Sequence, residues 1–315
     1  MTVTIRDATP DDLGVIAELY TRFLPDEPTT AEMLRAEDDL APANMHWRRF
    51  VAEQNGRVVG TSWAGQFTGM YHPDKYLVNV IVDPERQGRG VGRALTAHLD
   101  EHLGARGVLS TLADAREDHA RSVAFLEARG YEEVKRYFES RLDLTAFDFA
   151  PFEDRARVHP EYTLRTYEDL RANDPAFEQQ LFELFDAVRQ DVPRPEPATP
   201  LTPEDFARRA RHPLFRPEGV LVAVHTPTGE YAGLTELYAS SGAYLNTGLT
   251  GVRRAHRRRG LAFALKLASL RWARAQGAPE VRTGNESLNR PMLSINEALG
   301  YVKQPAWVQY RKTYR

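Results

Sequence analysis

Residues 78–103 read VNVIVDPERQGRGVGRALTAHLDEHL, an apolar strand-like run that passes through three glycines and three arginines into a helical pattern. Apolar residues recur at every fourth position from Val91 to Leu103, which predicts a helix with one buried face. A glycine-rich turn before such a helix leaves backbone N–H groups unpaired at the positive helix end and lets the chain approach a ligand closely. The segment therefore predicts a binding site for phosphate.

Several kinds of phosphate site could use such a loop. A dinucleotide fingerprint needs G-x-G-x-x-G after the first strand of a βαβ unit, but the spacing from Gly88 is G-x-G-x-G and Arg93 stands where the last glycine belongs. A Walker loop is excluded because no G-K-[ST] follows. Nucleic-acid binding would use RRAHRRRG at residues 253–260, but the net charge is −3 and no aromatic residues alternate with these arginines. A diphosphate held by backbone N–H groups and flanking arginines fits the loop best.

The second half of the chain repeats the pattern of the first. Gly260 follows Gly90 by 170 residues, and Gly300 follows Gly130 by the same 170. In each half a hairpin and a strand precede the basic loop, and a helix, strand, helix and strand follow it. We therefore expect two copies of one α/β fold of the α+β type, each a central mixed sheet flanked by helices.

The expected domain boundaries follow from this repeat. Residues 1–145 form an N-terminal domain, 146–160 a charged linker that contains proline, and 161–315 a C-terminal domain. A second Pro-rich stretch at residues 191–206 is interpreted either as a loop over a substrate site or as a solvated spacer.

Composition narrows the functional class. The chain has no cysteine, which excludes disulfides, thiolate metal sites and a cysteine-linked intermediate. No apolar run approaches the roughly 18 to 20 residues of a membrane helix, and the start of the chain lacks a signal-peptide core, so we expect a cytoplasmic protein. His98 and His102 have a metal-compatible spacing, but no third ligand is near in sequence, so no metal is expected. We expect neither nucleic acid nor membrane as a partner, and a monomer or homodimer.

The pattern [Q/R]-x-x-G-x-[G/A], present at residues 87–92 and 257–262, resembles the GNAT superfamily of acyl-CoA-dependent N-acetyltransferases. The two-copy arrangement resembles its tandem group, which includes mycothiol synthase. The resemblance implies that each loop binds the pyrophosphate of acetyl-CoA and that the preceding strand diverges from its neighbour. Pantetheine would then pair with the open strand edge, where a backbone N–H polarises the thioester carbonyl. The residues expected to bind CoA are Val80, Ile81, Val82, Gln87, Gly88, Arg89, Gly90, Val91, Gly92, Arg93, Thr250, Gly251, Val252, Arg257, Arg258, Arg259, Gly260, Leu261, Ala262 and Asn289.

The catalytic residues depart from the family pattern. The family often protonates the leaving thiolate with a tyrosine four residues before the helix-ending glycine, but Leu126 holds that position in copy one and Asn296 in copy two. Asn296 could hydrogen-bond the sulfur instead. Glu236 in GLTELY is the candidate base, because a carboxylate within an apolar strand is unusual; its alternative is an outward-facing strand residue.

The resulting hypothesis is an acetyl-CoA-dependent N-acetyltransferase that acetylates a primary amine of a small molecule by direct attack in a ternary complex. The alternative is a CoA-binding sensor in which one or both copies are non-catalytic, as the absent tyrosines suggest. By analogy with the tandem group, copy two would carry the chemistry and copy one would bind acetyl-CoA structurally.

Overall fold

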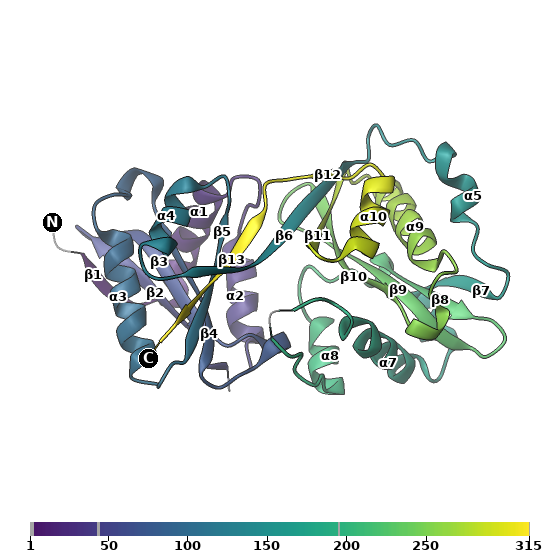
Figure 1. The fold of residues 1–315 in the computed structure, drawn as a ribbon, viewed down its shortest axis with the longest axis horizontal. Coiled ribbons are helices and arrows are strands. Elements are labelled where there is room, and N and C mark those ends of the chain that lie inside the picture. The colour runs from purple at the N-terminus through teal and green to yellow at the C-terminus, as the bar shows by residue number, and fades with distance from the viewer. Residues whose placement is uncertain (1–2, 43–44, 195, 315) are drawn as a thin grey trace. The chain divides into compact units, whose positions relative to one another are not determined.

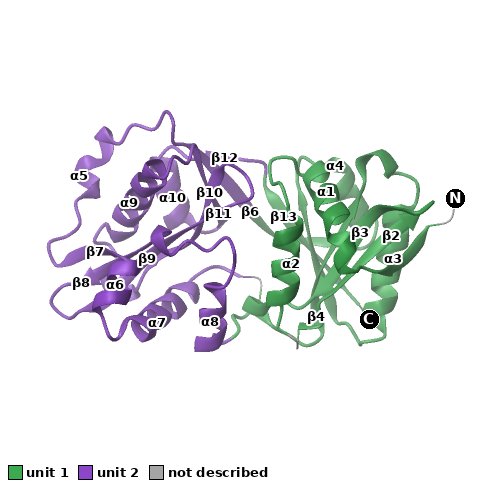
Figure 2. Cartoon of the chain, turned by 180° about the vertical axis from the view of Figure 1, so that it is seen from behind, with its two compact units in different colours: residues 1–136, 195–199, 306–315 green, residues 137–194, 200–305 purple. Residues whose placement is uncertain are grey.

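The computed structural model describes residues 3–42, 45–194 and 196–314 (Figure 1). Two compact units divide the chain (Figure 2): unit 1 comprises Met1–Arg136, Pro195–Thr199 and Ala306–Arg315, and unit 2 comprises Tyr137–Arg194 and Pro200–Pro305. These units differ from the boundaries expected at residues 145 and 161.

Strand pairing causes this difference. The last strand of the chain, β13 (Trp307–Thr313), pairs with β5 (Ser110–Arg116) of unit 1 over seven residues. Residues 137–143 of β6 (Glu132–Asp143) pair with β11 (Glu280–Glu286) of unit 2. The final strand of each half therefore belongs to the unit that the other half builds.

Unit 1 is a mixed sheet with helices on both faces. Its remaining elements are β1 (Thr4–Asp7), β2 (Arg48–Gln54), β3 (Arg57–Gly65), β4 (Lys75–Val82), α1 (Leu13–Phe23), α2 (Ala31–Leu40), α3 (Val91–Gly104) and α4 (Ala120–Glu127). The strand order is β1-β2-β3-β4-β5-β13, with β4 and β5 parallel and the other neighbours antiparallel. Phe50 packs with Leu99 of α3, whereas its neighbour Val51 packs with Ile16 of α1. Because successive strand residues point to opposite faces, α3 and α1 cover opposite sides of the sheet.

Unit 2 repeats this plan. Its remaining elements are β7 (Tyr162–Thr166), β8 (Val220–His225), β9 (Glu230–Tyr238), β10 (Tyr244–Val252), β12 (Val302–Lys303), α5 (Glu153–Ala156), α6 (Tyr167–Asn173), α7 (Phe177–Arg189), α8 (Pro203–Arg209), α9 (Leu261–Ala275) and α10 (Arg290–Ala298). The strand order is β6-β11-β10-β9-β8-β7, and β12 pairs with β6. The α/β class and the two-copy architecture expected from the sequence are confirmed.

Two segments expected to be connections have defined contacts. Glu196, in the second Pro-rich stretch, accepts hydrogen bonds from Lys75 Nζ at 2.9 Å and from Arg311 Nη2 at 2.8 Å, all within unit 1. In the expected linker, Phe147 and Phe152 pack against the hydrophobic core of unit 2. Neither segment is merely a solvated spacer.

Candidate active site

The sheet of unit 1 opens between β4 and β5. Their parallel pairing covers residues 75–77 against 110–112, although the strands continue to Val82 and Arg116. The pairing of β4 with β3 on its other side continues to Val82, so it is the edge facing β5 that is left open. In unit 2, β10 pairs with β11 only over residues 244–247. Both copies thus show the strand divergence that the family resemblance implied.

The loop after the diverging strand has the same backbone conformation in both units. In unit 1, Gly88 and Gly90 have φ of 76° and 88°; in unit 2, Arg258 and Gly260 have φ of 62° and 75°. Arg258 therefore adopts the left-handed conformation without glycine's steric freedom. The same turn precedes α3 and α9, whose first N–H groups lack intrahelical acceptors.

The first residue of each motif ties its loop to the preceding strand. Gln87 Nε2 donates to the carbonyl of Val82 at 3.3 Å, and Arg257 Nε donates to the carbonyl of Val252 at 3.0 Å. Both glutamine and arginine can make this bond because each carries a side-chain N–H donor of sufficient reach. This explains the choice of Gln or Arg in the repeated pattern.

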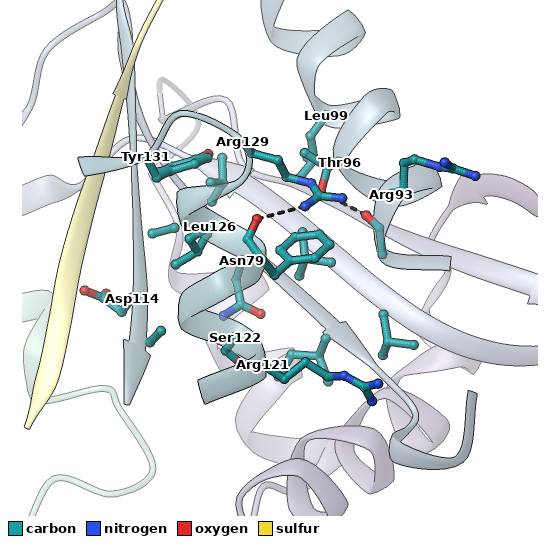
Figure 3. A pocket seen from close by; sticks show the side chains of 18 of the residues that line it. Asn79, Arg93, Thr96, Leu99, Asp114, Arg121, Ser122, Leu126, Arg129 and Tyr131 are labelled. Atoms are coloured by element: carbon teal, nitrogen blue, oxygen red, sulfur yellow. Dashed lines mark hydrogen bonds between the residues drawn. The ribbon is translucent and has the colours of Figure 1, made fainter. Parts of the chain in front are cut away.

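A cavity of about 600 Å³ lies in unit 1 between the diverged strands, the loop, α3 and α4 (Figure 3). Most of the unit 1 residues expected to bind CoA line it: Val80, Ile81, Val82, Gln87, Gly88, Gly90, Gly92 and Arg93. The side chain of Val91 packs in the core instead, and Arg89 is exposed. Leu126 lies in the cavity wall, so an apolar side chain stands where the family tyrosine was sought.

Three arginines add positive charge to the wall of the cavity. Arg93, Arg121 and Arg129 line it from α3, α4 and the turn after α4 (Figure 3). Arg121 Nη1 donates to Gln87 Oε1 at 3.0 Å, which holds the guanidinium beside the loop. Burial, and then the neighbouring charge of Arg93, lower the pKa of Arg129. An anion bound beside Arg93 would relieve this repulsion, and the Arg93 and Arg121 side chains both lie beside the glycine loop, so the residues present fit a diphosphate. Arg121 and Arg129 were not found from the sequence, since they lie outside the glycine motif.

A row of polar side chains crosses the sheet of unit 1 on the face that α1 covers. Trp63 on β3 is paired with Asn79 on β4, and Asp114 on β5 with Gln309 on β13. The hydroxyl of Tyr20, from α1, accepts from Trp63 Nε1 at 3.0 Å and donates to Asn79 Oδ1 at 3.3 Å. Burial raises the pKa of Tyr20 to about 12, so this hydroxyl stays neutral near pH 7.

Asp114 is the carboxylate of this row, and it adjoins the cavity. Extending the register of residues 75–77 with 110–112 by two positions sets Asp114 opposite Asn79 across the strand gap, and both line the cavity. Gln309 Nε2 donates to Asp114 Oδ1 at 3.1 Å. Burial raises the pKa of Asp114 to about 6, against a smaller lowering by Gln309. A carboxylate with this pKa is ionised at neutral pH and can accept a proton.

Glu236, the candidate base from sequence, is held in an ion pair in unit 2. Its side chain accepts hydrogen bonds from Arg209 Nη2 at 2.8 and 2.9 Å, and Glu236 is only 4% exposed. Its Oε2 also accepts the backbone N–H of Leu249 at 3.2 Å, beside the irregularity of β10 between Thr247 and Thr250. The carboxylate therefore uses an N–H of the strand expected to bind the thioester.

Asn296 is buried rather than exposed to a cavity. It is 1% exposed, and its Nδ2 donates to Asn285 Oδ1 at 2.5 Å. Its Oδ1 has no hydrogen-bond partner among residues 3–42, 45–194 and 196–314. Asn289 is the N-cap residue of α10, and its side chain forms no cap hydrogen bond there.

Carboxylates of unit 2 pair with several arginines of its basic loop. Arg257 pairs with Asp191, and Arg259 Nη1 pairs with Glu161 at 2.9 Å. The other expected CoA contacts of unit 2 have varied surroundings: Thr250 shares a hydrogen bond with Thr235, Val252 and Leu261 are in the core, Gly251 lies under α7, and Ala262 is half-buried.

Comparisons with known proteins agree with this architecture. The model of the Acetyltransferase (GNAT) family matches residues 14–131. Mycothiol acetyltransferase of Thermobifida fusca is 30% identical over 274 residues, which are 83% of this chain and 81% of that protein. Mycothiol acetyltransferase of Nocardiopsis dassonvillei is 28% identical over 327 residues, covering 95% of this chain and 96% of that one. The structure of a tandem GNAT protein from the clavulanic acid biosynthesis pathway has a TM-score of 0.81 at 24% identity, covering 99% of this chain and 98% of that chain.

The chain therefore belongs to the GNAT family of acetyltransferases. It is an N-acetyltransferase of tandem architecture, and its acetyl donor is acetyl-CoA. Among the described residues, no helix has the length and apolarity needed to cross a membrane. In the same residues, no group of three or more His, Cys, Asp or Glu side chains is placed to bind a metal ion.

Proposed function

We propose that this protein transfers an acetyl group to a primary amine of a small molecule by direct attack in a ternary complex, and that unit 1 performs the reaction. One observation carries the proposal. A single cavity reaches the phosphate-binding loop and both polar side chains, Asn79 and Asp114, that flank the strand gap. The relatives named mycothiol acetyltransferase support a small-molecule acceptor.

The donor half of the site binds and orients. Backbone N–H groups of the loop and of the first turn of α3, together with Arg93 and Arg121, would hold the diphosphate of acetyl-CoA. The open edge of β4 offers N–H groups to the pantetheine arm and to the thioester oxygen. When bound, acetyl-CoA supplies an acetyl group activated as a thioester.

The acceptor half of the site moves the proton. The amine nitrogen attacks the thioester carbonyl, so that a C–N bond forms and the C–S bond breaks. Asp114 takes the proton that leaves the nitrogen, and Asn79, fixed by Tyr20, orients the amine. Leu126 cannot protonate the sulfur, but a thiol with a pKa near 8.5 leaves as thiolate at pH 7 at a cost of about 2 kcal/mol. The missing tyrosine is therefore compatible with turnover.

Unit 1 is favoured over unit 2, although the analogy with the tandem group favoured copy two. The carboxylate of Glu236 is neutralised by Arg209 and already binds a backbone N–H of β10. By contrast, the hydrogen bond described for the Asp114 side chain comes from the neutral amide of Gln309, and Asp114 lines an open cavity.

The test is acetyl-CoA-dependent release of CoA across a library of small amines, with Asp114→Asn and Glu236→Gln compared on the accepted amine. We expect Asp114→Asn to abolish most of the activity and Glu236→Gln to retain it. The opposite result would place the chemistry in unit 2. Acetyl-CoA binding without turnover on any amine would overturn the proposal in favour of a CoA-binding sensor.

A further inference from the structure

The positions of α9 that correspond to the cavity wall of unit 1 are buried in unit 2. In α3, Arg93, Thr96 and Asp100 line the cavity. Adding the repeat offset of 170 gives Phe263, Lys266 and Leu270 in α9. These three residues are 5%, 2% and 1% exposed. Where unit 1 has a cavity, unit 2 therefore has a filled interior.

A segment before β7 covers this interior. Residues 147–156, here called the strap, contain Phe147, Phe149, Phe152 and the short helix α5, and these aromatic residues pack against the hydrophobic core that includes Phe263. The ring centroids of Phe152 and Phe263 are 6.0 Å apart, and Arg155 Cζ lies 3.8 Å from the centroid of the Phe263 ring. Phe263 corresponds to Arg93, at the helix end where the phosphate loop of unit 1 opens into the cavity.

Charged contacts hold the strap along α9. Arg271 Nη2 donates to Glu153 Oε1 at 2.7 Å. Arg274 donates to the carbonyl of Phe147, and its Cζ lies 4.6 Å from the centroid of the Phe149 ring. The strap is thus held at Phe147, Phe149 and Glu153 and is not a free linker.

The two arginines that line the cavity of unit 1 from α4 and the turn after it also have no cationic counterpart in unit 2. Arg121 and Arg129 of unit 1 correspond to Pro291 and Leu299, and Leu299 is 1% exposed in the same core. The buried Lys266 lies beneath, with its Nζ 4.9 Å from the centroid of the Tyr301 ring. This Nζ has no hydrogen-bond partner in the part of the chain that the structure describes.

We propose that the strap and the side chains of Phe263 and Lys266 close the donor cleft of unit 2, so that each chain binds one acetyl-CoA, in unit 1. The phosphate loop of unit 2 keeps its backbone shape, but Asp191 and Glu161 already pair with its arginines Arg257 and Arg259. The strap is an autoinhibitory contact, because opening the cleft requires its aromatic side chains to leave the core. The location of the open site in unit 1 rests on the proposed function.

The first experiment measures binding stoichiometry. Isothermal titration of the full-length protein with acetyl-CoA should give one site per chain, and Gly90→Val, which forces a β-branched residue into positive φ, should weaken that site at least tenfold. The opened variant Phe152→Ser with Phe263→Arg and Lys266→Thr, which restores the unit 1 residues in α9, should give two sites. A matched control, Phe206→Ser, removes a half-buried aromatic on α8 and should stay at one site.

The second experiment keeps the test valid if the opened variant fails to fold. Hydrogen exchange of the wild-type chain with saturating acetyl-CoA should slow in residues 87–93 and stay unchanged in residues 147–156 and 257–262. Two sites in the wild-type chain, or slowed exchange in the strap and the loop of unit 2, would overturn the inference. One site in unit 1 without turnover would overturn only the proposed reaction, and two sites with turnover abolished by Asp114→Asn would overturn only the closed cleft.

Discussion

Replacing Asp114 with asparagine separates catalysis from stability, because the two should change in opposite directions. The amide keeps an oxygen that can accept the Gln309 hydrogen bond, so the local structure should persist. Burial raises the pKa of Asp114 from 3.8 to about 6, so ionised Asp114 destabilises the fold at pH 7. A difference of about two pKa units corresponds to about 3 kcal/mol. Asp114→Asn should therefore raise the free energy of unfolding at pH 7 by up to about 3 kcal/mol.

The sign of the pH dependence follows from proton binding. Because the pKa of Asp114 is higher in the folded state, that state binds more protons between pH 4 and 6, and the contribution to stability falls as pH rises through this window. The advantage of Asp114→Asn should therefore vanish near pH 4. Urea unfolding at pH 4, 5, 6 and 7 measures it, with Asp11→Asn, an exposed carboxylate outside the cavity, as control.

The effect on activity should be a loss. Removing a general base costs about 10²–10⁴ in rate, so kcat/KM should fall by that factor. The wild-type kcat/KM should also decline below pH 6, as the carboxylate is protonated, and this limb should disappear in the variant. A kcat/KM within tenfold of wild type, with the limb near pH 6 intact, would refute the role of Asp114 as the base.

Three further perturbations follow from the structure. Arg121→Ala should raise the Kd for acetyl-CoA about 10- to 100-fold, as expected for loss of a charge-assisted hydrogen bond, and an unchanged Kd in calorimetry would exclude its contact with the diphosphate. Burial lowers the pKa of Lys266 to about 7, so between pH 7 and 10.5 the unfolded state binds more protons than the folded state, and the stability of the fold rises with pH there. Lys266→Met should therefore raise the free energy of unfolding by up to about 5 kcal/mol at pH 7 and by much less at pH 10. Equal gains in urea unfolding at both pH values would contradict this. Arg209→Ala should lower the free energy of unfolding by about 3–5 kcal/mol because it leaves the buried Glu236 carboxylate without its counter-ion, whereas Arg209→Leu with Glu236→Leu should recover most of the loss. An Arg209→Ala variant with the unfolding free energy of the wild type would show that the ion pair does not stabilise the fold.

The phosphate loops could be predicted from sequence because their determinants are local. Glycines at a fixed offset and a following amphipathic helix sufficed to place both turns, and the structure gives both the same backbone shape. The positive φ at Arg258 could not have been predicted, since that residue type disfavours it. Beside it, the side chain of Arg257 donates a hydrogen bond to the carbonyl of Val252, which ties the loop to the preceding strand.

The strand exchange and Asp114 depend on pairing between distant segments. The last strand of each half joins the sheet that the other half builds. β13 reaches β5 across nearly two hundred residues, as in the Gln309–Asp114 bond with a separation of 195. Asp114 stands between Ala113 and Ala115, which marks an alternating strand in the sequence. Its position across the gap from Asn79 appears only with the register of β4 and β5.

Glu236 shows why a buried carboxylate is an ambiguous sign of function. The sequence correctly indicated an unusual acid in an apolar strand, but not its partner, since Arg209 lies 27 residues earlier on α8. The same burial that makes a base effective also stabilises an ion pair, and the neighbouring cation decides between them. In unit 1 the corresponding strand, β3, carries Trp63 opposite Asn79, and the carboxylate beside the cavity is Asp114 on β5.

The two units share a backbone plan but differ in the side chains that face the cleft. Strand divergence and the loop turn are present in both, so neither feature distinguishes an open site from a closed one. The difference lies in α3 and α9, where a surface of Arg93, Thr96 and Asp100 is replaced by a core of Phe263, Lys266 and Leu270. Arginine and threonine beside a cavity retain water and can exchange it for a charged ligand, whereas aromatic and aliphatic side chains exclude both. A repeated motif is therefore sufficient to assign the fold of each copy, but donor binding must be inferred from the residues one to three turns into the following helix.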